Sequence, residues 1–282
     1  MSCNNEKVEK EYYNTGQLLS EFYLENGKKD GLFRSYYKNG KLKVVHNYKN
    51  DKRIDSSIYY YKQPKQKVKL IEYIINDSIK KLVYYDSIKP YIERKGKYLS
   101  NTIFIGKWSF YKNNKLDKII EFKKINNDSH INQDWYYDDD GKLIGGNHFQ
   151  LIHRDTTLLK EELNTFLNLV SPYFKRGTSK IVACISNSDT VDFNFNFSNE
   201  EKMKLACYQD FNTLKRKRKI AYLDYNYVTE VSKKFKTPGK KIVKGIIYEY
   251  LIKDRDSLGL EAAIENARKM YFEIPVFVKD SV

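Results

Sequence analysis

Residues 36–42, Tyr-Tyr-Lys-Asn-Gly-Lys-Leu, and residues 12–18, Tyr-Tyr-Asn-Thr-Gly-Gln-Leu, are two copies of one short pattern. In each copy a pair of aromatic residues is followed by two polar residues and a glycine. Glycine adopts the positive φ values that two-residue hairpin turns require, and asparagine tolerates them. The pattern therefore predicts a strand that enters a tight hairpin turn.

Such aromatic pairs recur through the first half of the chain at nearly constant spacing. The six pairs begin at Tyr12, Tyr36, Tyr60, Tyr84, Phe110 and Tyr136, in steps of 24, 24, 24, 26 and 26 residues. A second set of aromatic residues runs out of phase with the pairs: Tyr23, Tyr48, Tyr73, Tyr98 and Phe122. A fixed period of this length indicates a repeat array, here with two strands and two turns in each period. Because a lone hairpin is not stable in water, we expect successive hairpins to stack.

These repeats resemble the MORN repeat variant family, in which Tyr-Tyr-x-Asn-Gly-Lys-Leu is followed by Tyr-x-Asn-Gly-Lys-x-x-Gly. Residues 36–42 and 23–31 match well, whereas the copies between residues 60 and 97 match poorly. The resemblance covers about residues 10–147 and implies antiparallel hairpins that form an elongated sheet. It implies function only loosely, because some bacterial members are labelled antitoxins and others are repeats of surface or scaffolding proteins. It carries no catalytic residues.

The second half of the chain predicts further strands. They are expected at residues 163–170, 180–185, 191–197, 202–208, 219–228, 241–252 and 270–279. About seven strands at such spacing favour an antiparallel β-sandwich, and residues 238–249 resemble late strands of immunoglobulin-like or transthyretin-like domains. Strict alternation places Phe193, Phe195 and Phe197 on one buried face.

Two segments of the second half allow a helix. Residues 155–163 could open one, although we favour a strand from residue 163 onward. Residues 256–269 are expected to form a helix of one or two turns or an irregular crossover. The whole chain is therefore predicted to be all-β, with an antiparallel hairpin-repeat array followed by a β-sandwich. The expected parts are an N-terminal tether (residues 1–10), a repeat domain (11–149) and a sandwich domain (150–282).

The chain is strongly basic, with a formal net charge of +15 and a pI near 9.3. This charge would suit an anionic partner, but Lys, Asn, Ile and Tyr are all abundant, which is the bias of an AT-rich genome. Lysines at hairpin tips and outward strand positions also discourage edge pairing, so nucleic-acid binding is not expected. The densest cationic run is Lys215, Arg216, Lys217, Arg218 and Lys219. It is either a contact loop for a polyanion or acidic partner, or a solvated connection.

Cys3 follows Met1 and Ser2 and precedes a short polar stretch, as the lipid-modified cysteine of a lipoprotein does. No apolar signal segment precedes it, so the chain is either a mature lipoprotein with an added start methionine or Cys3 is accidental. We interpret Cys3 as a lipid attachment site and expect a membrane-anchored protein of the cell envelope; the alternative is a cytoplasmic protein. Cys184 and Cys207 fall in predicted strands and could pair in an oxidising compartment, but two free, packed cysteines are the default interpretation.

Motifs for catalysis and cofactor binding are missing from the sequence. It contains no nucleophile elbow, phosphate loop, dinucleotide fingerprint or zinc pattern. Residues 138–141, Asp-Asp-Asp-Gly, are interpreted as a turn because the glutamate of a calcium loop is missing. His148 and His153 are five residues apart, which would point them to opposite faces of a strand. No catalytic residue, metal or cofactor is therefore expected.

The second aromatic residue of each pair is the candidate contact surface, because tyrosine is enriched in interfaces. These residues are Tyr13, Tyr37, Tyr61, Tyr85, Tyr111 and Tyr137. If the array is one sheet, one aromatic row is core and the other forms an external ladder; otherwise both rows are buried. The sequence thus predicts a non-enzymatic binding, display or scaffold protein with a protein partner. The alternative is an antitoxin or immunity protein.

Overall fold

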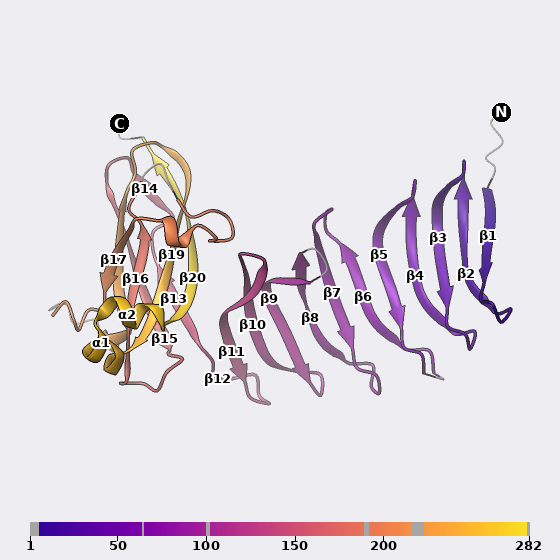
Figure 1. Cartoon of the computed structure of the whole chain (residues 1–282), viewed down its shortest axis with the longest axis horizontal. Helices are drawn as coiled ribbons and strands as arrows, with labels where there is room; N and C mark the ends of the chain where they lie inside the picture. The colour runs from indigo at the N-terminus through magenta and orange to yellow at the C-terminus, as the bar shows by residue number, and fades with distance from the viewer. Residues whose placement is uncertain (1–5, 64, 100–101, 189–191, 216–222, 281–282) are drawn as a thin grey trace. The chain divides into compact units, whose positions relative to one another are not determined.

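The computed structural model describes residues 6–63, 65–99, 102–188, 192–215 and 223–280. Twelve strands form one antiparallel sheet in chain order (Figure 1). They are β1 (Glu6–Tyr12), β2 (Leu18–Glu25), β3 (Lys28–Tyr36), β4 (Leu42–Lys49), β5 (Lys52–Tyr60), β6 (Val68–Ile74), β7 (Ile79–Tyr85), β8 (Ile92–Leu99), β9 (Ile103–Lys112), β10 (Lys115–Ile125), β11 (Asp128–Tyr137) and β12 (Leu143–Gly145). The predicted hairpin array is confirmed. Residues 6–10, expected to belong to a tether, lie in β1 and pair with β2.

The hairpin turns depend on residues that tolerate positive φ. Asn26 and Gly27 have φ of 50° and 76°, and the pair Asn113–Asn114 has φ of 50° and 65°. Two successive positive values are what a type I′ turn needs, and this turn matches the twist of the strands that it joins. Asn114 shows that asparagine can replace glycine at the second turn position in a later repeat.

Two further sheets follow the repeat array. One has the order β13-β15-β18 and the other β14-β20-β19-β16-β17. Their elements are β13 (His148–Ile152), β14 (Thr156–Leu158), β15 (Glu162–Ser171), β16 (Ser179–Ser186), β17 (Leu205–Gln209), β18 (Val228–Lys234), β19 (Gly239–Leu251) and β20 (Arg268–Lys279), with the 3₁₀ turns η1 (Glu200–Lys202) and η2 (Tyr225–Tyr227) and the helices α1 (Ile252–Leu258) and α2 (Leu260–Glu265). The helical crossover expected within residues 256–269 is confirmed. β14 pairs parallel with β20, so the second half is not purely antiparallel as predicted.

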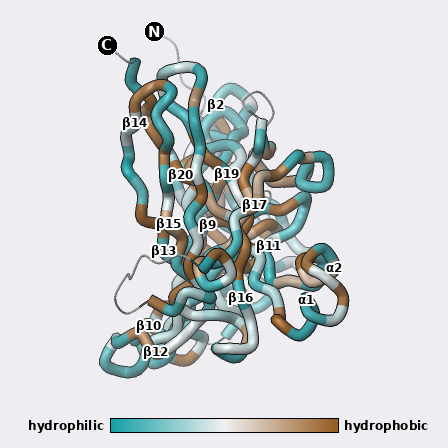
Figure 2. Tube along the Cα trace, turned by 90° about the vertical axis from the view of Figure 1, so that its left-hand side faces the viewer, coloured by the Kyte–Doolittle hydropathy of each residue, from teal (hydrophilic) through white to brown (hydrophobic). Residues whose placement is uncertain are grey.

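The two sheets of the second half enclose a common hydrophobic core. Leu167 of β15, Val231 of β18, Ile181 of β16 and Ile247 of β19 are all buried in one cluster. Hydrophobic segments recur along β15, β19 and β20 (Figure 2). Alternation along a strand supplies one apolar face to each sheet, and joining two such faces removes both from water. The strands predicted at residues 163–170, 180–185, 241–252 and 270–279 correspond to β15, β16, β19 and β20, which contribute side chains to this core.

Three local predictions in the second half were wrong. Residues 192–197 form turns rather than a strand, and Phe195 is exposed while Phe193 and Phe197 are buried. An asparagine side chain explains the turn, because Asn194 Oδ1 accepts a hydrogen bond of 2.9 Å from the backbone amide of Ser198. The described end of the strand expected at 219–228 is the 3₁₀ turn η2, and the strand follows it as β18. Cys184 and Cys207, expected to be free, are disulfide-bonded across β16 and β17.

Contacts divide the chain into two compact units. Unit 1 comprises residues 1–119 and 139–141, and unit 2 comprises residues 120–138 and 142–282. The division falls inside β10, so the last repeat strands belong to the same unit as the two further sheets. Within unit 2, Asn132 of β11 and Tyr271 of β20 exchange two hydrogen bonds, at 2.7 and 3.0 Å.

Candidate binding surface

A register shift recurs near the turn of five hairpins and defines which of their aromatic residues are equivalent. Tyr12 pairs with Leu18, Tyr36 with Leu42, Tyr60 with Val68, Tyr85 with Ile92 and Tyr137 with Leu143, each just after a shift. In the first three repeats this position is held by the first residue of the aromatic pair. In the repeats of Tyr85 and Tyr137 it is held by the second residue. Equal spacing in sequence therefore does not mean an equal place in the fold.

The tyrosine that follows this position joins neighbouring repeats. The Tyr13 hydroxyl donates to the Tyr36 carbonyl at 2.7 Å, and Tyr37 donates to Tyr60 at 2.8 Å. Tyr61 donates in the same way to Tyr85 at 2.8 Å. Each of these side chains is half-buried, and each hydrogen bond crosses to the next repeat. We call these three bonds the tyrosine staples.

The six tyrosines predicted as contacts therefore do not share one environment. Tyr13, Tyr37 and Tyr61 form the staples, whereas Tyr85 and Tyr137 occupy the position just after the register shift, one place earlier in the repeat. The ring of Tyr111 lies 5.2 Å from Lys95 Nζ. All six are half-buried. The exposed members of the pairs are first residues, Tyr12 and Tyr136. Whether any of the six binds a partner stays a prediction.

One face of the repeat sheet is filled by its own side chains. Its central row runs across successive strands through Phe22, Phe33, His46, Ser57, Glu72, Leu82, Gly96 and Trp108, which we call the packed face. The Phe33 ring stacks on Phe22 and on His46, with centroids 6.0 and 5.7 Å apart. Trp108 is almost completely buried. Side chains from adjacent strands thus cover one another on this face.

A buried carboxylate lies at the centre of the packed face. Glu72 accepts a hydrogen bond of 2.5 Å from the Tyr98 hydroxyl and forms ion pairs with Arg53 and Lys80 at 3.3 and 3.4 Å. Burial, together with the Glu72 carboxylate, raises the pKa of Tyr98. Because two cations and a hydroxyl compensate this buried charge, Glu72 ties β5, β7 and β8 to β6. We interpret the cluster as structural; a lone acidic residue between apolar ones in residues 70–74 was the only sequence signal for it.

His46 is a neutral member of the packed face. Its Nδ1 lies 2.7 Å from the Ser57 hydroxyl, and the ring contacts Tyr48 and Tyr59 edge-on. Burial, reinforced by the charge of Arg53, lowers the pKa of His46 to about 4. The ring is therefore uncharged near neutral pH.

The opposite face exposes apolar side chains to solvent. It carries Val8, Tyr23, Leu32, Val45, Ile58, Ile71 and Tyr73, which we call the open face. Val8 is 47% exposed, and Tyr23, Leu32 and Tyr73 are each 39% exposed. Val45, Ile58 and Ile71 are directly paired across β4, β5 and β6. A run of partly exposed apolar residues on one face of a sheet is the kind of patch that marks an interaction surface.

Positive charge is concentrated in the part of the chain that bears the open face. Residues 1–119 contain 25 Lys and Arg and 13 Asp and Glu, a difference of +12, whereas residues 120–282 contain 26 and 23. Lysines also stand beside open-face aromatics, since Lys81 Nζ lies 5.7 Å from the centre of the Tyr73 ring. The surface thus combines exposed rings with cations.

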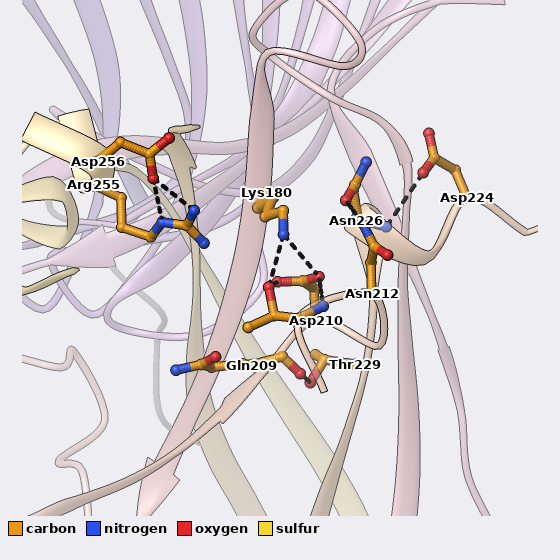
Figure 3. A network of polar contacts seen from close by, with 10 residues as sticks. Lys180, Gln209, Asp210, Asn212, Asp224, Asn226, Thr229, Arg255 and Asp256 are labelled. Atoms are coloured by element: carbon orange, nitrogen blue, oxygen red, sulfur yellow. Dashed lines mark hydrogen bonds and ion pairs between the residues drawn. The ribbon is translucent and has the colours of Figure 1, made fainter. Parts of the chain in front are cut away.

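The predicted cationic loop is described only at its start. Lys215 is exposed, and Arg216, Lys217 and Arg218 lie outside the described residues. The turn that leads to this run is fixed by the buried Asp210, which accepts hydrogen bonds from the backbone amide and hydroxyl of Thr213. Lys180 lies beside the same carboxylate, with Nζ 3.7 Å from Asp210 Oδ1 (Figure 3). Lys180 Nζ also donates to the Thr213 hydroxyl at 2.8 Å. This network explains how the start of the loop is held.

The comparison with protein families bears on the repeats. A model of the family described as MORN repeat variant matches residues 5–26 and 29–50. The matched segments contain β1, β2, β4 and all of β3 except its first residue, together with two tyrosine staple donors, Tyr13 and Tyr37. The resemblance seen in the sequence is therefore supported for the first two repeats, and this family suggests a binding or scaffold role. No curated protein and no solved structure matched the chain.

Across the ranges that the structure describes, no group of three or more His, Cys, Asp or Glu is placed to hold a metal ion. Neither described helix has the length and apolar character that a membrane span requires.

Proposed function

We propose that the repeat array is a non-enzymatic binding module that presents the open face to a protein partner with an acidic surface. The observation that carries this proposal is the contrast between the two faces of one sheet. On the packed face, Trp108 and Phe22 are buried by neighbouring side chains, whereas Tyr23 and Tyr73 on the open face remain 39% exposed. Tyrosine offers a large, rigid contact area at low entropic cost.

The charge of the array supports an acidic partner rather than a purely apolar one. An excess of 12 cations over residues 1–119 steers an oppositely charged surface toward the sheet and raises the rate of association. The rings and aliphatic side chains of the open face would then supply the buried centre of the interface. Such a contact should weaken as salt concentration rises.

The double variant Tyr23→Ser/Tyr73→Ser tests the open face. The matched control is Tyr173→Ser, which makes the same change at a tyrosine of unit 2 that is 64% exposed. All three proteins would be immobilised and exposed to an extract of the native source, and the retained proteins would be compared by quantitative mass spectrometry. We expect a protein that the wild type and the control retain equally and that the double variant retains at least about fivefold less.

The retained protein would then be purified and titrated by calorimetry. The proposal requires a defined stoichiometry, weaker binding by the double variant and weaker binding at high salt. Identical affinities for the wild type and the double variant would overturn it. If the partner is a toxin whose activity the chain abolishes at that stoichiometry, the antitoxin alternative holds.

Attachment to the cell envelope through Cys3 is a separate part of the proposal. Cys3 lies outside the described residues, and its support is the short polar sequence around it. Intact-mass analysis of the protein from its native source tests it. A mass increase that maps to Cys3 and matches diacylglycerol with an acyl chain is expected; an unmodified Cys3 thiol would refute it.

A further inference from the structure

Unit 2 contains a cavity of about 630 Å³ that none of the proposed roles uses. It lies between the end of β16 and the hairpin that joins β18 to β19. Five lysines contribute to its lining: Lys233, Lys236, Lys240, Lys241 and Lys244. A volume of this size is typical of pockets that bind small molecules.

The cavity also has an apolar side. Ile185 and Val243 are buried core residues, and Phe235 is buried beside them. Ile242 is 53% exposed and adds apolar surface to the lining. The lining therefore offers cations and apolar side chains side by side. A simple inorganic anion would contact only the cations and would leave the apolar side chains of the pocket in contact with water.

Several of the lysine ammonium groups are held by neutral oxygens. Lys233 Nζ donates to the carbonyls of Ser186 and Ser188, both at 2.9 Å. Lys241 Nζ donates to the Thr237 hydroxyl at 2.6 Å. Such contacts fix the positions of the cations but leave their charge available to an anion.

Among the residues that the structure describes, Asp192 and Glu273 bring carboxylates to these lysines. Asp192 is the single acidic residue in the described lining, and Glu273 pairs with Lys244 at 4.0 Å. Lys244 Nζ also donates to the carbonyls of Phe193 and Asn194, at 3.1 and 3.2 Å. The described lining thus keeps an excess of positive charge around the apolar wall.

We propose that this pocket binds a small amphiphilic anion, with a phosphate or carboxylate head among the lysines and a hydrocarbon part against Ile185, Phe235 and Val243. Charge-assisted hydrogen bonds from ammonium groups are the strong contacts for such a head group. Burial of the hydrocarbon part adds free energy in proportion to its apolar area. The buried Phe235 ring offers no exposed platform for base stacking, which disfavours a single-stranded nucleic acid as the ligand.

Calorimetric titration of the full chain with dodecyl phosphate, below its critical micelle concentration, tests the pocket. Inorganic phosphate and dodecanol serve as probes of the head and of the tail alone. We expect one molecule of dodecyl phosphate to bind per chain, and each partial probe to bind at least about tenfold more weakly. Dodecanoate in place of dodecyl phosphate shows which head group the lysines prefer.

The variant Lys240→Gln/Lys241→Gln should weaken dodecyl phosphate binding by about tenfold or more, because one charge-assisted contact is worth about a factor of ten. Its matched control is Lys202→Gln/Lys253→Gln, which removes two exposed lysines outside the pocket. Unfolding curves of all variants verify that the fold is retained. The proposal is overturned if dodecyl phosphate does not bind, if inorganic phosphate binds equally well, or if both double variants weaken binding to the same extent.

Discussion

Replacing Gly96 by alanine tests the packing of the repeat array. A Cβ atom at this position would lie 2.2 Å from Cδ2 and 2.4 Å from Cγ of the Trp108 ring, whereas ordinary contact begins at 3.4 Å. The ring would have to move by more than 1 Å. It is 1% exposed, packs on Phe104 at a centroid distance of 4.5 Å and donates from Nε1 to the Lys97 carbonyl at 2.8 Å. Little room is therefore available for that movement.

The expected cost follows from these contacts. Overpacking in a well-packed site costs about 1–3 kcal/mol, and weakening the Trp108 hydrogen bond adds about 1 kcal/mol. Alanine restricts the unfolded chain and returns about 0.4–1 kcal/mol. Gly96 does not have a left-handed φ, so the backbone adds no strain. The net loss of unfolding free energy should be about 2–3 kcal/mol.

Urea unfolding followed by tryptophan fluorescence measures this loss. Gly145→Ala in β12 is the matched control, because its Cβ would meet no atom within 4 Å. In a Trp108→Leu background the smaller side chain should remove most of the cost of Gly96→Ala. The packing argument fails if Gly96→Ala and Gly145→Ala unfold within about 0.5 kcal/mol of each other, or if the cost persists in the Trp108→Leu background.

Three further substitutions test other contacts. Tyr37→Phe removes one staple and should destabilise the chain by about 1 kcal/mol in urea unfolding, whereas the exposed Tyr12→Phe should be nearly neutral. The pKa of His46 is about 4 in the folded chain and about 6.5 in the unfolded chain, so the unfolded state binds this proton more tightly. The free energy of unfolding should therefore fall on the order of 2–3 kcal/mol between pH 6.5 and pH 4. His46→Gln should flatten the pH profile of the unfolding free energy in this range. If the variant and the wild type lose stability in parallel, His46 is not the group responsible. Cys184→Ser with Cys207→Ser opens a bridge with a sequence separation of 23 residues and should cost about 3 kcal/mol relative to the oxidised chain, a difference that should vanish when the wild type is reduced.

The hairpin array was predictable because its determinants are local. A turn needs positive φ at one or two adjacent residues, and Asn or Gly within a few positions of the strand predicts such a turn. The same logic extends to later repeats, where Asn113 and Asn114 both have positive φ. The spacing of successive turns gives the repeat period. Because each period holds two strands and two turns, the array is predicted to be all-β.

The strand prediction for residues 192–197 was wrong because an alternating pattern contains no information on competing side-chain hydrogen bonds. Phe193, Phe195 and Phe197 alternate with asparagine, yet Phe197 has a φ of 54° and the Asn194 side chain accepts from the Ser198 amide. The turn buries two of the three rings and exposes the third. Pairing of Cys184 with Cys207 was equally beyond local pattern, because it depends on the register of β16 with β17.

The second set of aromatic residues explains why the candidate surface was not found in the aromatic pairs. Tyr23 and Tyr73 lie on the open face, whereas Tyr48 contacts Phe33 and Tyr98 contacts Glu72 on the packed face. Steps of 25 residues, an odd number, thus place successive members on opposite sides of the sheet. Three tyrosines of the aromatic pairs donate their hydroxyl hydrogens to the tyrosine staples. The most regular feature of the sequence therefore stabilises the array, and exposure depends on which side each strand presents.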